Sequence, residues 1–110
     1  MKVFQLLADA QFHDNNPYAE PLHVSETGRI LRFALRPGQI VREHTAPHSP
    51  VYLVVLQGRG MFAGADGQEQ TFGPHTLLTF EPGEAHAIRA LDEDLVFVAV
   101  LHGAPGWSHG

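Results

Sequence analysis

Apolar and polar residues alternate along most of the chain, and no apolar repeat of 3.6 residues persists long enough to predict a helix. At most one short helical turn is expected, near residues 4–10. The clearest alternating run is 31–36, a half-buried strand that stops at Pro37 and Gly38. The run 51–56 is apolar at both parities, which predicts a strand covered on both faces.

Turn residues divide the rest of the chain into further short strands. Asp66 and Gly67 predict a hairpin, because both central positions of a type I′ turn take positive φ. The other expected strands are 22–25, which pairs with the strand from residue 29 onward, then 61–63, 68–72, 76–80, 85–91 and 95–101; residues 12–21 are interpreted as an ordered loop. Seven or eight short strands at close spacing are typical of a sandwich or barrel, so the expected fold class is all-β.

Length and composition agree with this prediction. The chain has 110 residues, which fits a single domain spanning 1–110. With 44% hydrophobic and 17% charged residues, the composition is that of a globular protein rather than a disordered one. Eleven glycines and eight prolines favour short strands joined by many turns.

Charge and cysteine content exclude several classes of function. The formal net charge is −5 and the seven Lys and Arg residues are scattered, so no nucleic-acid partner is expected. Without cysteine, the chain forms no disulfide, iron–sulfur cluster or thiol nucleophile. The N-terminus does not resemble a signal peptide, and no apolar run approaches the roughly 18 residues of a membrane helix, so a cytoplasmic protein with no membrane partner is expected. The eight histidines direct any metal chemistry toward imidazole and carboxylate ligands.

Two segments place histidines beside turns, at or near predicted strand ends. The first runs from Gly38 through His44 to His48, and the second contains His86, three residues after Gly83. On a barrel such positions can converge at one mouth, where side chains from separate strands enclose a cation.

These spacings resemble the cupin family, whose motifs are G-x5-H-x-H-x(3 or 4)-E-x6-G and G-x5-P-x-G-x2-H-x3-N. The first corresponds to about 38–58, with His44 at its first histidine and Gly58 at its closing glycine. The second corresponds to about 73–90, with His86 at its histidine. The resemblance implies a single cupin domain, a jelly-roll-like double-stranded β-helix barrel that is commonly dimeric, with a metal held by three histidines and one glutamate.

Several motif positions carry other residues here. The second histidine of motif one falls on Ala46 and its glutamate on Val51, while the glycine, proline and asparagine of motif two fall on His75, Glu81 and Ala90. Of the four ligands that the resemblance implies, only His44 and His86 remain.

His48 offers a third donor, so the expected metal ligands are His44, His48 and His86. If the chain stays extended, residues 44 and 48 share strand parity and face one cavity. Pro47 and Pro50 restrict the backbone there, and a solvated loop histidine is the alternative. Three imidazoles with water suit zinc, nickel, iron(II), manganese or copper(II), and the missing carboxylate shifts the preference from manganese toward zinc, nickel or copper.

The cavity beside these histidines is expected to bind a small molecule. Arg42 shares parity with His44 and could receive an anionic substrate, the alternative being a salt bridge at the barrel edge. Glu84 could complete the metal shell, the alternative being a solvated turn. The apolar residues expected to line the cavity, or otherwise to form the core, are Phe33, Leu53, Val55, Phe80, Ile88 and Phe97. Surface or packing roles are expected for His13, His23, His75, His102 and His109.

The fold leaves the function open. Three hypotheses remain. The first is a barrel that binds a metal and a small molecule, and the second is a metal-dependent dioxygenase or isomerase acting on a small organic acid, phenol or sugar derivative. The third is a metal-free binding barrel. No catalytic residue can be named. A homodimer is expected from the resemblance, from the doubly apolar run 51–56, and from Trp107, which could cover a barrel end or a partner subunit.

Overall fold

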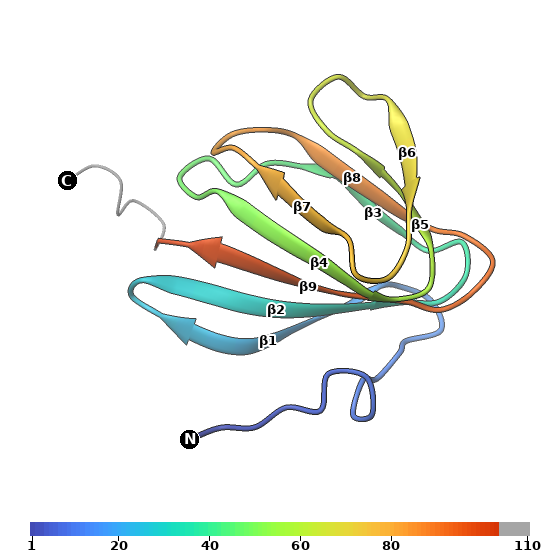
Figure 1. Ribbon diagram of the computed structural model, residues 1–110, viewed down its shortest axis with the longest axis horizontal. Coiled ribbons are helices and arrows are strands. Elements are labelled where there is room, and N and C mark those ends of the chain that lie inside the picture. The colour runs from blue at the N-terminus through green and yellow to red at the C-terminus, as the bar shows by residue number, and fades with distance from the viewer. Residues whose placement is uncertain (104–110) are drawn as a thin grey trace.

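The computed structural model describes residues 1–103, and within them nine β-strands form two antiparallel sheets (Figure 1). The larger sheet has the order β1-β2-β9-β4-β7 and the smaller has the order β3-β8-β5-β6. The strands are β1 (Tyr18–Ser25), β2 (Gly28–Leu35), β3 (Ile40–His44), β4 (Val51–Gln57), β5 (Gly60–Ala63), β6 (Glu69–Phe72), β7 (Leu77–Phe80), β8 (His86–Ala90) and β9 (Leu95–His102).

The alternating pattern predicted most of these strands correctly. Two departures are β3, which the pattern missed, and the first half of β1, interpreted as loop. β3 is short, polar at Arg42 and Glu43, and interrupted by a bulge, so it has no period-2 signal. The turn near residues 4–10 is confirmed, because the Asp9 N–H donates to the Gln5 carbonyl at 3.0 Å. No helix among residues 1–103 is long and apolar enough to cross a membrane.

The hairpin between β5 and β6 is confirmed, but its predicted turn type is wrong. Gly67 has φ of 73°, whereas Asp66 does not have positive φ. The Gly67 N–H donates to the Gly64 carbonyl at 3.0 Å, and the Asp66 carboxylate accepts from the Gln68 N–H at 3.0 Å. A longer loop with one left-handed glycine therefore closes the hairpin.

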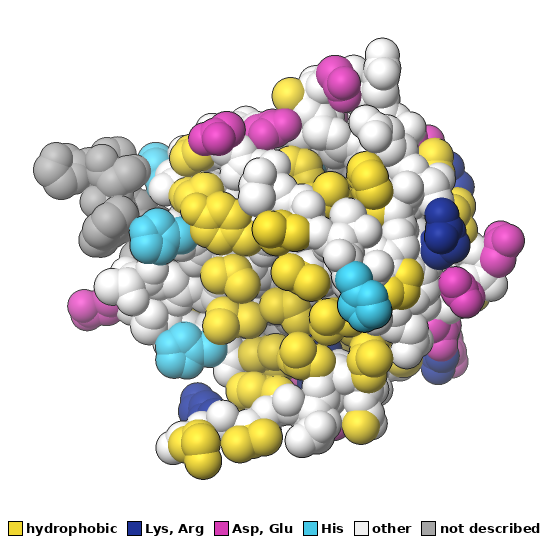
Figure 2. Space-filling view, in the orientation of Figure 1, with side chains coloured by type: hydrophobic (Ala, Val, Ile, Leu, Met, Phe, Trp, Pro, Cys, Tyr) yellow, Lys and Arg dark blue, Asp and Glu magenta, His cyan; other side chains and the backbone are white. Residues whose placement is uncertain are grey.

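The core lies between the two sheets, where every second residue of β2, β4, β8 and β9 points inward. Leu53, Val55 and Phe97 are at most 1% exposed. The outer face of β4 is less covered than its doubly apolar sequence predicts, since Tyr52 is 39% exposed. Figure 2 shows apolar side chains gathered over β9, β4 and β7 on this side of the molecule.

A buried arginine holds the N-terminal segment against β2. Arg32 is 3% exposed and donates to Glu20 at 2.6 Å, to the Leu6 carbonyl at 3.2 Å and to Asp9. The hydrogen bond from Arg32 holds the pKa of the Asp9 carboxyl below its usual value. Two carboxylates and the backbone carbonyls of Leu6 and Asp9 compensate the buried guanidinium, and they tie residues 6–9 to the larger sheet.

Candidate functional site

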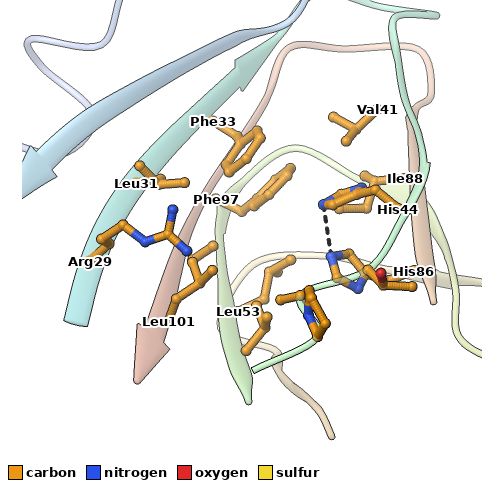
Figure 3. A pocket seen from close by; sticks show the side chains of 15 residues that line it. Arg29, Leu31, Phe33, Val41, His44, Leu53, His86, Ile88, Phe97 and Leu101 are labelled. Carbon is orange, nitrogen blue, oxygen red and sulfur yellow. Dashed lines mark hydrogen bonds between the residues drawn. The ribbon is translucent and has the colours of Figure 1, made fainter. Parts of the chain in front are cut away.

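A cavity of about 280 Å³ opens between the two sheets. Figure 3 shows the side chains that line it. Its walls are mostly apolar, and the rings of Phe33 and Phe97 stack at 4.8 Å between centroids. Its polar side chains are Arg29, His44, Thr45 and His86, and the described lining includes no Asp or Glu. A site of this kind suits a small and largely apolar molecule with few polar groups.

Two histidines meet on one side of this cavity. His44 ends β3 and His86 begins β8, and the two are register partners in the smaller sheet. Their Nε2 atoms lie 2.9 Å apart (Figure 3). The pairing of two strands that are far apart in the sequence therefore creates the contact.

Backbone carbonyls orient both rings. The His44 Nδ1 lies 2.9 Å from the Arg42 carbonyl oxygen, and the His86 Nδ1 lies 3.1 Å from the Glu84 carbonyl oxygen. A carbonyl oxygen only accepts, so each Nδ1 carries a proton and, in the neutral ring, each Nε2 presents a lone pair. Two lone pairs 2.9 Å apart repel each other unless a cation, either a proton or a metal ion, lies between them.

The distance between the two nitrogens is compatible with a shared metal ion. Two imidazole nitrogens bound to one ion at about 2.0–2.1 Å, with the two bonds at a right angle, lie about 3 Å apart. His86 is 5% exposed, and its ring packs on Phe80 at 4.8 Å between centroids. Burial, helped by the charge of His44 and opposed by the Glu84 carbonyl, lowers the pKa of His86, which favours the neutral ring that a metal ligand needs.

His48 does not join this pair, so the three-histidine site predicted from the sequence is not formed. Residues 47 and 48 form a turn, which ends the extended parity that the prediction assumed. His48 is absent from the cavity lining and instead lines an adjoining small depression, which shares Arg29, Ala46 and Pro47 with the cavity. Within residues 1–103, no group of three or more His, Cys, Asp or Glu side chains could hold a metal ion.

The prediction that Arg42 lines the cavity is also wrong. The register between β3 and β8 shifts between Val41 and His44, so both of these residues reach the cavity although they are three positions apart. The bulge inverts the parity on which the prediction depended, and Arg42 is exposed.

The remaining predicted lining residues divide into two groups. Those that line the cavity as expected are Phe33, Leu53, Ile88 and Phe97. Val55 and Phe80 instead belong to the buried core outside the lining. Glu84 stays in its turn, where its carboxylate accepts from the Glu81 N–H at 3.0 Å.

The other histidines lie apart from the cavity. His13, His23, His75 and His102 are exposed, and His13 stacks on Tyr18 at 4.3 Å between centroids. Trp107 and His109 lie outside the described residues.

Ala46 and Val51, which replace two ligands of the motif, both line the cavity beside the two histidines. The four motif positions therefore share one cavity, and only two carry donor side chains.

Arg29 also lines the cavity, although no motif singles it out. The alternation of β2 could have found it, because the inward row of Phe33 and Leu31 continues to Arg29 two residues earlier.

The fold has two antiparallel sheets, and the histidines of the two motifs both line the cavity between them. These features are those of the class of cupin-fold proteins. The family model described as "Cupin domain" matches residues 31–101, and the chain belongs to this family. No curated protein matches the chain.

Solved structures place the fold in the same class. An RmlC-like cupin protein from Desulfovibrio desulfuricans is 27% identical, with a TM-score of 0.82 over 92% of this chain and 96% of that one. A Thermus thermophilus protein is 21% identical, with a TM-score of 0.87 over 96% of this chain and 100% of that one. An uncharacterised protein with a double-stranded β-helix domain from Klebsiella pneumoniae is 17% identical, with a TM-score of 0.86 over 93% and 90%.

Proposed function

We propose that the protein binds a small organic molecule in the cavity, beside a divalent metal ion held by His44 and His86. The facing Nε2 atoms carry the proposal, because with both Nδ1 atoms directed at carbonyls the pair requires a cation between them. The apolar walls would contact the organic part of the bound molecule.

The donor set fits a metal only in part. The chain offers two imidazoles, so water or atoms of the bound molecule would fill the other coordination positions. Neutral nitrogen donors without a carboxylate favour zinc, nickel or copper over manganese. When bound, such an ion acts as a Lewis acid and lowers the pKa of its water. The carbonyls of Arg42 and Glu84, which bind the two Nδ1 atoms, would hold both imidazoles in place to bind such an ion through Nε2.

Elemental analysis tests this proposal. We expect about one zinc, nickel, copper or iron per wild-type chain, lost in His44→Ala and in His86→Ala. His48→Ala is the matched control, because His48 lies outside the cavity, and it should keep the metal. A wild-type protein that takes up no metal after incubation with zinc, nickel and iron(II) would contradict the metal part of the proposal.

A metal-free binding barrel is the second candidate. It is favoured by the lack of any group of three or more potential ligands in the described part of the chain. In that case a proton would bridge the two Nε2 atoms, and the pair would carry one positive charge. The same elemental analysis separates the two candidates, and a small ligand would then raise the melting temperature without added metal.

We also propose that two copies associate through the outer face of the larger sheet. Tyr52, Val54, Val98 and Val100 are neighbours on β4 and β9 there, and the exposed Leu77 pairs with Val54. A contiguous apolar face suits a two-fold interface, in which the same face meets itself.

A further inference from the structure

Arg29 lines the cavity, and the proposed metal site at the histidine pair gives it no role. It lies near the start of β2, on the inward row whose next two members are the apolar residues Leu31 and Phe33. β2 belongs to the larger sheet, whereas both histidines belong to the smaller one. Figure 3 shows Arg29 and the histidines reaching the cavity from opposite sides, with Phe33, Phe97 and Leu53 between them.

The Arg29 guanidinium has a buried nitrogen without a hydrogen-bond acceptor, which distinguishes it from the arginines that form ion pairs. Its Nε is buried and makes no hydrogen bond to any described atom. By contrast, Arg32, Arg36 and Arg89 each form an ion pair with a carboxylate. A buried N–H without an acceptor destabilises the protein, and a ligand that draws the guanidinium toward the cavity would supply that acceptor.

The chemistry of the cavity specifies the acceptor. No Asp or Glu lines the described cavity, so nothing there neutralises Arg29. The guanidinium offers two parallel N–H groups that match a carboxylate. The apolar walls and the volume of about 280 Å³, at the lower end of ordinary ligand pockets, call for a small and apolar remainder.

We propose that the ligand is a small organic acid with an apolar body, whose carboxylate binds Arg29 while its opposite end lies at the histidine pair. This inference rests on the proposed function, because it names the class of molecule that the same cavity takes. It assigns to Arg29 the binding and orientation of the acid, and it requires no chemical step.

Matched acids and amides test the proposal. The probes are benzoate, phenylacetate and isovalerate, each compared with its neutral amide by calorimetry and thermal shift in Tris chloride, which contains no competing carboxylate. At least one acid should bind wild-type protein at least about tenfold more tightly than its amide, since bonds between charged groups account for that difference. Equal binding of acids and amides, or no binding of any acid, would overturn the proposal.

Two variants separate binding from structure. Arg29→Met keeps an apolar stem and removes the orphaned Nε, so it should abolish the preference for the acid while leaving the melting temperature without ligand equal or higher. Arg29→Lys keeps the charge without the bidentate geometry and should bind the acid with intermediate affinity. An Arg29→Met protein that binds the acid as the wild type does would overturn the proposal, as would one that unfolds more easily, since Arg29 would then be structural.

Measuring the metal content shows whether the inference about Arg29 or the proposed metal site is the one that fails. Each titration is run on protein as purified and on zinc-treated protein, with metal measured in the same samples. A preference for the acid that depends on Arg29 in metal-free protein supports the inference while the metal proposal fails. A full complement of metal in wild type and Arg29→Met, without any preference for the acid, overturns the inference alone.

Discussion

At the scale of single residues, one departure from the cupin motif places a histidine at a backbone conformation that favours glycine. Among residues 1–103, His75 is the one residue other than glycine with positive φ, at 69°. It stands at the position where the second motif has glycine. The left-handed conformation costs a residue with a Cβ about 1–2 kcal/mol, so His75 keeps the turn at the expense of stability. Its N–H nevertheless donates to the Val55 carbonyl at 2.8 Å, which ties the turn to β4.

His75→Gly should therefore stabilise the protein. The free energy recovered by relieving the strained φ is larger than the entropic cost of a more flexible unfolded chain with glycine. The expected net increase in the free energy of unfolding is about 0.5–1 kcal/mol. Thermal unfolding should show a rise of a few degrees in Tm. His75→Ala is the control, because it removes the imidazole and keeps a Cβ at positive φ. An equal rise in both variants would mean that the side chain, rather than the backbone, is responsible.

At the scale of elements, the connection between β4 and β5 passes against the start of β9. Gly58 has φ of 79°, and a Cβ built on it would lie 2.0 Å from the Asp94 carbonyl oxygen. Gly67, in the hairpin between β5 and β6, has a similar φ of 73° and nothing within 4 Å of the corresponding position. The two glycines share a conformation and differ in what surrounds them.

This difference predicts unequal effects of the same substitution. Gly67→Ala should cost about 1 kcal/mol, from its conformation alone. Gly58→Ala adds a backbone clash and should cost about 2–4 kcal/mol more, because the connection must move away from β9. Urea unfolding of both variants measures the two losses of free energy. Equal losses would show that the Asp94 contact does not constrain the connection.

At the scale of the whole molecule, the apolar outer face of the larger sheet sets the expected assembly. In gel filtration with light scattering, the wild-type protein should have twice the chain mass of 12.1 kDa. Tyr52→Arg places a charge in the middle of that face and should give monomers, since an unpaired charge is costly within an apolar interface. Ile40→Arg is the control, because Ile40 is 53% exposed on β3 of the other sheet. A wild-type monomer, or a dimer unaffected by Tyr52→Arg, would contradict the assignment of this face.

Alternation and turn residues along the chain are sufficient to predict an all-β fold and most of its strands, and the motif spacing names both histidines of the proposed metal site. This works because burial on one face imposes a period of two locally, and because turns select glycine and proline. His44 and His86 could be named because they occupy the histidine positions of the two cupin motifs, so this part of the prediction rests on the resemblance to the family.

Contacts between distant segments decided the rest. A bulge in β3 turned Arg42 outward and Val41 inward, and the turn at residues 47 and 48 removed His48 from the cavity. Alternation places Arg29 on the inward row of β2, but only the packing of the larger sheet against the smaller one brings it to the same cavity as the two histidines. Parity predicts a side chain's direction only while strand pairing continues without a bulge, and the side chains that meet across two sheets depend on pairing between residues far apart in the sequence.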